Sequence, residues 1–428
     1  MIKLVKNYPK IAAIMVLILV LVISIILKQL VSLFYKNQQP LALVQESSAV
    51  DTEQVTSISE NVDIIQEQEE MRAIWVPFMS ITMSSEIDKS EAAFQKKFDE
   101  IVRKSKEKGM NTLIVQVRPF GDAFYTSTLF PWSHLLTGTQ GQNPGYDPLQ
   151  YMVKAAHEQK LKIHAWVNPL RIQLNTNPSE LSVENPYVLW SGDESKKGWG
   201  VEYENGKYMN PAYPEVRKYI ADGVKEIVEN YDVDGIQFDD YFYPTQDSVF
   251  DQSEYKSYQD EASKNGIPMD LLEWRQGNIN AMVSQVYAEI KKVKPQVVFG
   301  IAPQGNIQNC LNMGADVSKW CSTQGYVDYI CPQLYVNFDN KALPYGTAVK
   351  EWRGMVTNLS IKLYFGLGLY KAGSDVDEGT WKKSNTIIAD QIAAGREAQG
   401  DGFMIYSYDY LSHEQTEQEV QNALKLLN

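Results

Sequence analysis

The sequence predicts a (β/α)8 barrel with long loops inserted after its early strands, preceded by an N-terminal transmembrane helix. From Met71 onward, short runs rich in β-branched and aromatic residues alternate with long amphipathic segments, which is typical of βα units around a parallel sheet. Eight such runs lie within about 360 residues, which suits a closed barrel. No glycine-rich phosphate loop follows any run, so the alternative of an open doubly wound sheet is less favoured.

The predicted elements follow one another in a regular order. The expected strands are 72–77, 111–118, 161–168, 233–239, 296–302, 326–335, 362–369 and 401–407. The expected helices are 91–108, 147–160, 213–230, 268–293, 347–358, 382–399 and 413–427, with a weaker one at 312–320. Long insertions at 119–146, 169–212 and 241–267 follow the second, third and fourth strands. All three leave the carboxyl end of a strand, which is the end where barrel enzymes build their active sites.

The N-terminal region predicts a membrane anchor. Between Ile11 and Leu27 the only polar residue is Ser24, and a span of that length is near the lower limit of about 17–25 residues for a transmembrane helix. Three lysines precede the run, which favours a cytoplasmic N-terminus. We expect an uncleaved signal anchor. A cleaved signal peptide and a buried helix are the alternatives.

The chain is expected to divide into three parts. Residues 1–36 form a cytoplasmic stub and the anchor, and residues 70–428 form the barrel. Residues 37–69 are rich in Gln, Glu, Ser and Val and contain no aromatic residue, so they are expected to be a flexible linker. With either an anchor or a cleaved signal, the barrel lies outside the cytoplasm; with an anchor, the protein belongs to the cell membrane as a single-pass protein.

Composition disfavours several classes of partner. Forty basic and 53 acidic residues give a net charge of -13 without a basic block, so nucleic acid is a poor partner for the barrel. Cys310, Cys321 and Cys331 are too few for a disulfide framework and are expected to be small buried residues, although one pair could bridge. The four histidines lack metal-ligand spacing, so neither a metal nor a cofactor is expected, and nothing indicates the oligomeric state.

Polar residues recur at inward-facing positions of the predicted strands. Side chains alternate along a strand, so if Ile236 and Phe238 face the helices, Gln237 and Asp239 face the barrel interior, with Asp239 at its carboxyl rim. The same alternation groups Gln116 with Arg118, Trp166 with His164 and Asn168, and Gln333 with Tyr335. Because buried polar groups are costly in a purely structural core, we expect these side chains to converge in one pocket.

Asp239 and Asp240 are the candidate catalytic residues. A carboxyl group buried beside aromatic residues has its pKa raised by desolvation, as a general acid near neutral pH requires. Adjacent strand residues point to opposite faces, so Asp240 reaches the same mouth only if the strand ends at Asp239. Otherwise Asp240 is expected to cap a helix or to pair with an arginine such as Arg118.

Several segments resemble the glycosyl-hydrolase-like family 10 barrels of bacteria. The signature is Asp234 to Pro244, with the sequence DGIQFDDYFYP. Other matches are RAIWV at 72–76, VQVRP at 115–119, HAWVNP at 164–169, IAPQG at 301–305 and CPQLY at 331–335. The resemblance covers about residues 70–428. It implies a TIM barrel that acts on bacterial glycans, with peptidoglycan strands stripped of their stem peptides as the leading substrate class.

A more distant similarity to chitinase-type barrels bears on the mechanism. Their fourth strand reads Asp-Gly-x-Asp-x-Asp-x-Glu, and here Gln237 replaces one Asp while Tyr241 stands where the proton-donating Glu would be. The acid role therefore falls to Asp239 or Asp240. Whichever of the two is not the acid would hold the acid in position or stabilise a developing positive charge.

Two sources remain for a second catalytic group. In a substrate-assisted mechanism the acetamido group of the sugar is the nucleophile, and no second protein carboxylate is needed. Otherwise Asp339 and Asp409, which follow the sixth and eighth strands, are the candidates for a protein base or nucleophile.

The remaining candidates are expected to bind the sugar. Arg118 would hold a lactyl or other carboxylate through its planar fork, and Trp166 would form the floor of the site. His164 lies deeper and is expected to be a core histidine. The further candidates are Asn168, Gln237, Tyr241, Gln304, Gln333 and Tyr335. The alternatives to this function are a catalytically inactive carbohydrate-binding barrel and a glycosidase that acts on a different polysaccharide.

Overall fold

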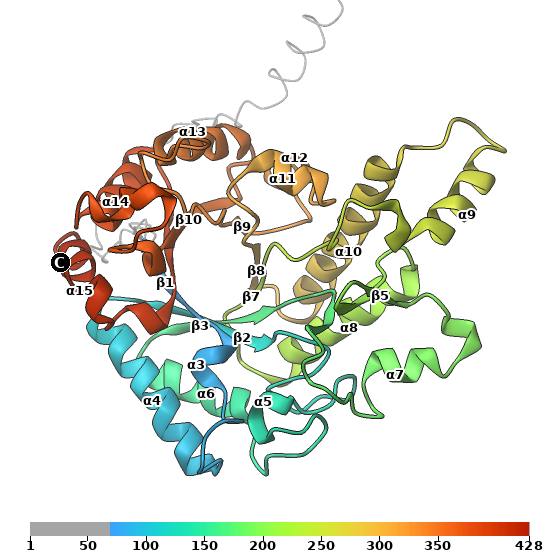
Figure 1. The fold of residues 1–428 in the computed structure, drawn as a ribbon, viewed down its shortest axis with the longest axis horizontal. Coiled ribbons are helices and arrows are strands. Elements are labelled where there is room, and N and C mark those ends of the chain that lie inside the picture. The colour runs from blue at the N-terminus through green and yellow to red at the C-terminus, as the bar shows by residue number, and fades with distance from the viewer. Residues whose placement is uncertain (1–68, 428) are drawn as a thin grey trace, which may run out of the picture. The chain divides into compact units, whose positions relative to one another are not determined.

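The computed structural model of the protein describes residues 69–427. Eight parallel strands close into a barrel in the order β1-β11-β10-β9-β8-β7-β3-β2, and β2 pairs with β1 to complete the ring (Figure 1). The strands are β1 (Met71–Val76), β2 (Thr112–Arg118), β3 (Lys162–Val167), β7 (Gly235–Phe238), β8 (Val298–Ile301), β9 (Tyr329–Ile330), β10 (Lys362–Gly368) and β11 (Gly402–Tyr406). This closure confirms the predicted (β/α)8 barrel, and the alternative of an open sheet is wrong.

β9 is much shorter than the predicted strand at 326–335. It consists of Tyr329–Ile330, and further on Gln333 joins its neighbours through isolated bridges to Gln304 and Gly366. Pro332 lies between the two and has no N–H to contribute to a ladder, which interrupts the strand. The interruption leaves the Gln333 side chain at the end of the barrel.

Helices surround the barrel (Figure 1). The longer ones are α4 (Glu91–Glu107), α6 (Pro148–Glu158), α8 (Pro214–Asn230), α9 (Gln252–Ala262), α10 (Leu271–Val293), α13 (Tyr345–Met355), α14 (Ile387–Glu397) and α15 (Glu417–Leu424). α10 begins at a capping box in which Asp270 and Glu273 each bond the other's backbone N–H. The buried faces of the helices other than α9, which has no buried residue, pack with the outward side chains of the strands to form the main hydrophobic core.

The predicted helix at 312–320 has the wrong bounds. Two short helices occupy this region, α11 (Ile307–Asn312) and α12 (Val317–Ser322). The chain turns between them at Gly314, whose φ of +81° lies in the left-handed region that glycine adopts most easily.

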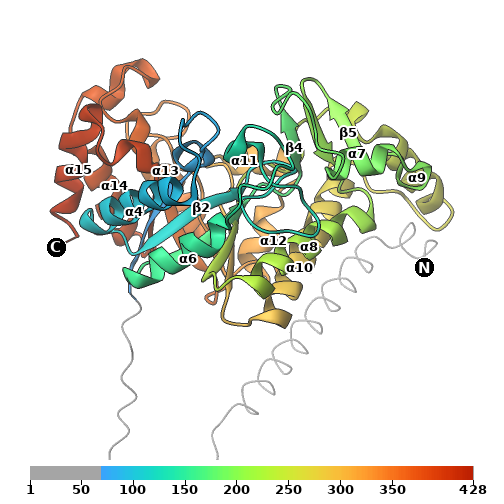
Figure 2. The same cartoon turned by 90° about the horizontal axis from the view of Figure 1, so that it is seen from below.

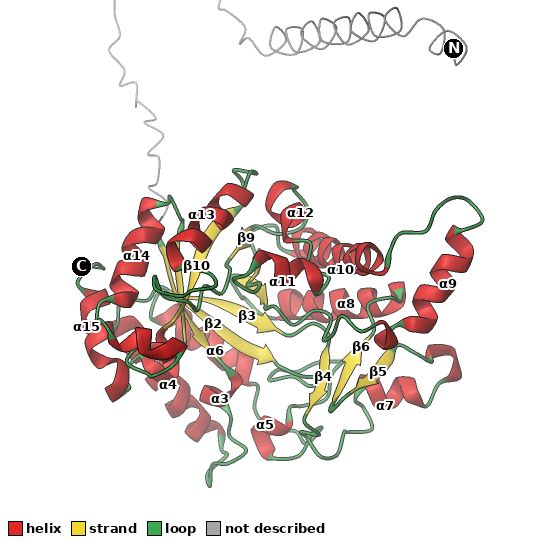
Figure 3. Cartoon of the chain, turned by 45° about the horizontal axis from the view of Figure 1, so that its top comes forward, coloured by secondary structure: helices red, strands yellow, loops and turns green. Residues whose placement is uncertain are grey.

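The loop after β3 builds a small sheet of its own. It is antiparallel with the order β4-β6-β5, from β4 (Arg171–Leu174), β5 (Gly200–Tyr203) and β6 (Gly206–Met209), and it stands beside the barrel (Figure 3). Figure 2 shows β4, β5, α7 (Pro186–Ser191) and α9 together on the side away from α14 and α15. The two remaining short helices are α3 (Phe78–Ile81) and α5 (His134–Thr137). The long insertions therefore extend one flank of the barrel mouth.

The barrel interior is filled by a second cluster of side chains that includes Trp75, Trp166, Tyr329 and Tyr364. Gly300 makes room for this cluster, because a Cβ there would lie 2.0 Å from the Tyr329 ring. His164 belongs to the same layer, with Nδ1 3.0 Å from the Tyr329 hydroxyl oxygen. Its burial lowers its pKa to about 4, so it is neutral at physiological pH, as expected of a core histidine.

Two further predictions from the sequence concern the N-terminal membrane anchor and the state of the three cysteines. Among the described residues no helix is long and apolar enough to cross a membrane. The predicted anchor at 1–36, and the predicted linker at 37–69 except for its last residue, lie outside the described part of the chain. Cys310, Cys321 and Cys331 are buried free thiols, in agreement with the expectation of small core residues.

Candidate active site

A cavity of about 360 Å³ opens at the carboxyl ends of the barrel strands. Its polar walls are Gln116, Arg171, Asp239, Asp240 and Gln333, and its aromatic walls are Trp75, Phe78, Trp166, Tyr241, Tyr335, Tyr370 and Tyr406. A hollow of about 480 Å³ lies at the amino ends of the strands, among residues such as Arg72 and Lys162. Barrel enzymes carry their chemistry at the carboxyl end, so we assign the candidate active site to the first cavity.

Asp239 lies at the bottom of this cavity, directly after β7, and is 3% exposed. Its Oδ2 accepts hydrogen bonds from Trp166 Nε1 at 3.1 Å and from Asn168 Nδ2, and its Oδ1 accepts one from the Tyr241 backbone N–H at 3.3 Å. Burial, followed by the neighbouring charge of Asp240, raises the pKa of Asp239 to about 7. A large fraction of Asp239 is therefore protonated at neutral pH, which suits a general acid.

Asp240 reaches the same cavity because β7 ends at Phe238 and the chain turns. Its Oδ1 accepts a hydrogen bond from Gln333 Nε2 at 2.9 Å, and the same amide donates to the Ala302 carbonyl oxygen at 2.8 Å. Burial raises the pKa of Asp240, while the bond from Gln333 opposes this shift. The two adjacent carboxyl groups thus share one mouth, and an amide, not Arg118, engages Asp240.

Arg118 was expected at the mouth and lies elsewhere. A register shift between Gln116 and Arg118 turns the Arg118 side chain out of the barrel at the end of β2. Its guanidinium lies 4.2 Å from the centroid of the Phe130 ring, and a Cβ at Gly223 of α8 would lie 3.5 Å from it. The prediction that Arg118 binds a sugar carboxylate is therefore wrong, because one irregular position reversed the alternation on which it rested.

Four of the other sequence candidates line the cavity: Trp166, Tyr241, Gln333 and Tyr335. Asn168 stands behind the wall. Its Oδ1 accepts a hydrogen bond from Gln116 Nε2 at 2.7 Å, which fixes the amide so that its Nδ2 donates to Asp239. Gln116 thus orients a donor to the candidate acid.

Gln237 and Gln304 do not line the cavity. Gln237 faces the interior, as parity predicted, but its Oε1 accepts a hydrogen bond from Trp75 Nε1 at 2.5 Å and its Nε2 donates to the Tyr329 hydroxyl at 3.2 Å. These bonds hold Gln237 in the packed layer of interior side chains that lies beneath the cavity. Gln304 is half-buried beside Asp240. A hydrogen bond from its side chain partly opposes the rise in the pKa of Asp240 that burial causes.

The two carboxylates considered as alternatives are outside the cavity wall. Asp409 accepts hydrogen bonds from the Ser80 hydroxyl at 2.9 and 3.0 Å, and Asp339 pairs with Lys383 at 2.9 Å. Both are exposed to solvent. Asp239 and Asp240 are the acidic residues that line the cavity.

The sequence analysis did not predict Arg171 or several of the aromatic residues that line the cavity. Arg171 begins β4, three residues after Asn168, in a loop that has no periodicity. Trp75 and Tyr406 lie on predicted strands, and parity would have found them if aromatic residues had been counted with the polar ones. Tyr370 follows β10 in a short 3-10 turn, where no regular pattern marks it.

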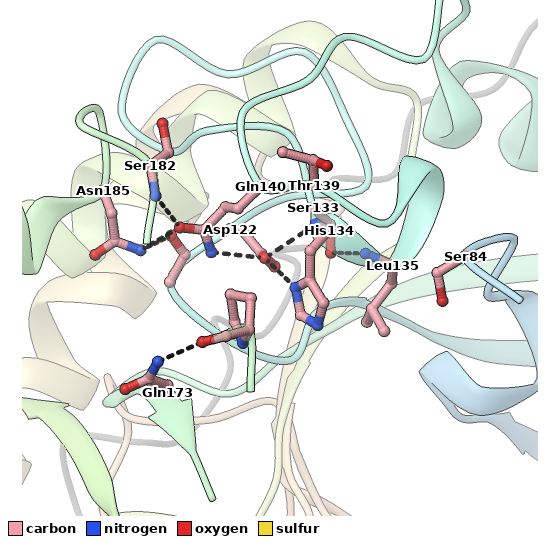
Figure 4. Close-up of polar contacts among 12 residues, drawn as sticks. Ser84, Asp122, Ser133, His134, Leu135, Thr139, Gln140, Gln173, Ser182 and Asn185 are labelled. Atoms are coloured by element: carbon pink, nitrogen blue, oxygen red, sulfur yellow. Dashed lines mark hydrogen bonds and ion pairs between the residues drawn. The ribbon is translucent and has the colours of Figure 1, made fainter. Parts of the chain in front are cut away.

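A polar cluster fastens the loop after β2 to the loop after β3 (Figure 4). The buried Asp122 carboxylate accepts hydrogen bonds from His134 Nδ1 at 2.8 Å and from Gln140 Nε2 at 2.9 Å. Gln140 Oε1 in turn accepts from the Ser182 backbone N–H at 2.9 Å and from Asn185 Nδ2 at 3.1 Å. Segments that are far apart in the sequence are thereby held together at one flank of the mouth.

The pKa of Asp239 leads to a testable pH dependence. If Asp239 donates a proton, kcat/KM should fall as the pH rises through about 7, where Asp239 ionises. The Trp166 hydrogen bond lowers this pKa, so Trp166→Phe should move the falling limb to higher pH. A pH–rate profile measures the limb. Trp199→Phe, just before β5 and outside the cavity wall, is the matched control. An unmoved limb in Trp166→Phe would contradict the assignment.

The fold and the site together define a class of protein. A closed parallel barrel, a carboxyl-end cavity with aromatic walls and a buried carboxyl group of near-neutral pKa are typical of barrel glycoside hydrolases. The family model described as Glycosyl hydrolase-like 10 matches residues 70–383. The chain therefore belongs to the glycosyl hydrolase-like 10 family and is a glycoside hydrolase.

Two bacterial relatives agree with this family. The chain is 34% identical over 355 residues to Glycosyl hydrolase YngK of Bacillus subtilis (strain 168), covering 78% of this chain and 67% of that protein. It is 32% identical over 373 residues to Glycosyl hydrolase DigH of Escherichia coli (strain K12), covering 82% of this chain and 83% of that protein.

The fold is also similar to that of solved structures. The glycoside hydrolase domain of PgaB (BpsB) from Bordetella bronchiseptica has a TM-score of 0.57 at 13% identity, over 83% of this chain and 99% of that one. The catalytic domain of β-amylase from Paenibacillus polymyxa has a TM-score of 0.55 at 12% identity, over 84% of this chain and 98% of that one. At these identities the likeness shows the fold alone.

Proposed function

We propose that the protein hydrolyses glycosidic bonds in peptidoglycan glycan strands that carry no stem peptides, with Asp239 as the general acid. The observation that carries this proposal is the Asp239 carboxyl group, which is buried at the barrel mouth with a pKa of about 7. Membership of a family of glycosyl hydrolases supports the reaction type. The cavity volume of about 360 Å³ is within the usual range for a ligand site.

The walls of the cavity suit a sugar. Trp75, Tyr335 and Tyr406 pack against one another with ring centroids 5.6–6.4 Å apart, which makes a rigid apolar surface for the faces of sugar rings. Asp239 would protonate the leaving oxygen. Asp240, oriented by Gln333, would steady the positive charge that develops on the sugar or on its acetamido group.

Incubation of the full chain in detergent with peptide-free glycan strands tests the proposal, with chitin oligomers as the comparison and mass analysis of the products. We expect shortened glycan fragments from the peptide-free strands. Binding without products would instead support a carbohydrate-binding barrel without turnover. Cleavage of another polysaccharide with no action on these strands would overturn the substrate class.

We also propose that residues 1–36 anchor the protein in the cell membrane and that residues 37–69 link this anchor to an extracytoplasmic barrel at 70–428. The support is the apolar run from Ile11 to Leu27 behind three lysines. In fractionated cells the full-length chain should be found with the membrane, and protease added outside should degrade the barrel. A shortened chain released into the medium would support a cleaved signal peptide instead.

A further inference from the structure

We infer that Arg171 binds a carboxylate of the substrate and so selects glycan strands whose lactyl groups are free acids. This inference rests on the proposed function and deepens it, because it names the chemical group of the glycan that the site recognises. It also gives Arg171, the first residue of β4, the role that the sequence had suggested for Arg118 at the end of β2.

Arg171 is an almost buried cation on the cavity wall. The residue is 8% exposed, and its Cζ lies 3.8 Å from the centroid of the Tyr241 ring and 5.9 Å from that of Phe120. A guanidinium that stacks on an aromatic ring keeps its N–H donors at its edge, where they are open to a planar partner. Arg171 therefore combines a fixed position with free bonding capacity at the site.

No carboxyl group in the described part of the chain neutralises Arg171 by direct contact. Its positive charge lowers the pKa of both Asp239 and Asp240. Within residues 69–427, however, no carboxylate oxygen approaches the guanidinium to the 4.0 Å of an ion pair. An almost buried charge without an ion-pair partner is costly, and a substrate anion would relieve this cost.

The two neighbouring loops hold Arg171 in place. The Gly121 N–H donates to the Ile172 carbonyl oxygen at 3.0 Å, and Asn185 Nδ2 donates to the Gly121 carbonyl oxygen at 3.1 Å. A Cβ at Gly121 would lie 3.0 Å from Ile172 Cγ2, so the two segments are in close contact. The Asp122 cluster of Figure 4 fixes the same segment next to Phe120, whose ring lies beneath the guanidinium.

The chemistry of the glycan provides one anion for such a site. The lactyl ether of N-acetylmuramic acid ends in a carboxyl group, which is an uncharged amide when a stem peptide is attached and an ionised acid when it is not. A guanidinium fork binds a carboxylate through two parallel hydrogen bonds and cannot bind an amide in this way. The substrate would then be supplied by a reaction that hydrolyses the lactyl amide.

Two glycan substrates that differ only in whether the lactyl carboxyl group is an ionised acid or a methyl ester test the inference. Peptide-free strands are compared with the same strands after methyl esterification of their lactyl groups, and kcat/KM is measured for both. The wild type should lose about 10- to 100-fold on the ester, which is the range for a charge-assisted hydrogen bond. Arg171→Gln should cleave the acid and the ester at similar rates, and Arg171→Lys should lie between the two.

The acid-to-ester ratio is the decisive readout, because it does not depend on the folded fraction or on a changed pKa of Asp239. Arg103→Gln, on the exposed face of α4, should keep the wild-type ratio. A wild-type ratio in Arg171→Gln would overturn the inference. If Arg171→Gln cleaves neither substrate, calorimetric binding in an Asp239→Asn background gives the same ratio.

The outcomes separate this inference from the proposed function. Cleavage of peptide-free strands without discrimination between acid and ester would overturn the role of Arg171 and leave the proposed function intact. No cleavage of these strands, together with Arg171-dependent cleavage of a uronic-acid oligosaccharide, would overturn both the lactyl source and the proposed substrate. Cleavage of chitin oligomers as fast as of the free acid would also overturn carboxylate selection.

Discussion

Asp239→Asn should lower kcat for glycan cleavage by about 10²- to 10⁴-fold, which is the usual contribution of a general acid. The amide cannot donate a proton to the leaving oxygen, although its carbonyl oxygen can still accept the hydrogen bonds from Trp166 and Asn168. The substitution therefore removes the proton while it keeps most of the local geometry. Initial rates of product release measure the loss, and circular dichroism with thermal unfolding checks the fold.

Asp409→Asn is the matched control for this experiment. Asp409 is the exposed carboxylate near the mouth that the sequence left as an alternative, and its partner is the Ser80 hydroxyl. We expect its rate to stay within about twofold of the wild type, since surface substitutions away from a site have small effects. If Asp409→Asn abolished activity and Asp239→Asn did not, the assignment of the acid would be reversed.

Arg275→Met should lower the free energy of unfolding by about 3–5 kcal/mol, because it leaves a buried charge without its partner. Arg275 forms an ion pair with Asp251 at 2.6 Å, and the two side chains are 3% and 0% exposed. The guanidinium also donates to the carbonyl oxygens of Thr245 and Asp247 at 3.0 and 2.7 Å. It thereby holds the loop that follows Asp239 and Asp240, so activity should fall together with stability.

The double variant Arg275→Met/Asp251→Asn is the control for a buried charge. It removes the carboxylate that the single variant leaves unpaired, so it should be more stable than Arg275→Met alone. Burial raises the pKa of Asp251 and Arg275 opposes this, so without Arg275 the pKa rises further. A folded-state pKa above the unfolded value means that stability is lost as the pH rises. The deficit of the single variant should therefore be larger in alkaline than in acidic buffer, whereas a pH-independent deficit would indicate lost packing alone.

Much of the site follows from the strand pattern. Asp239 and Trp166 were expected at the barrel mouth, and both line the cavity. The alternation of side chains is a local property of the extended chain, and it persists wherever the ladder is regular. Gln237 shows the limit of this reasoning, because facing inward did not bring it to the cavity. Trp75 and Tyr329 bind its amide in the layer below.

The sequence by itself determined the eight strands, the barrel that they close and the inward position of Asp239, because hydrophobic periodicity is a local property of the sequence. Only the tertiary structure decided which arginine lies in the cavity. A register shift turned Arg118 outward, and Arg171 came in on a loop sheet that has no period of its own. Such positions depend on contacts between distant segments, such as the one between Gly121 and Ile172, and no local pattern encodes them.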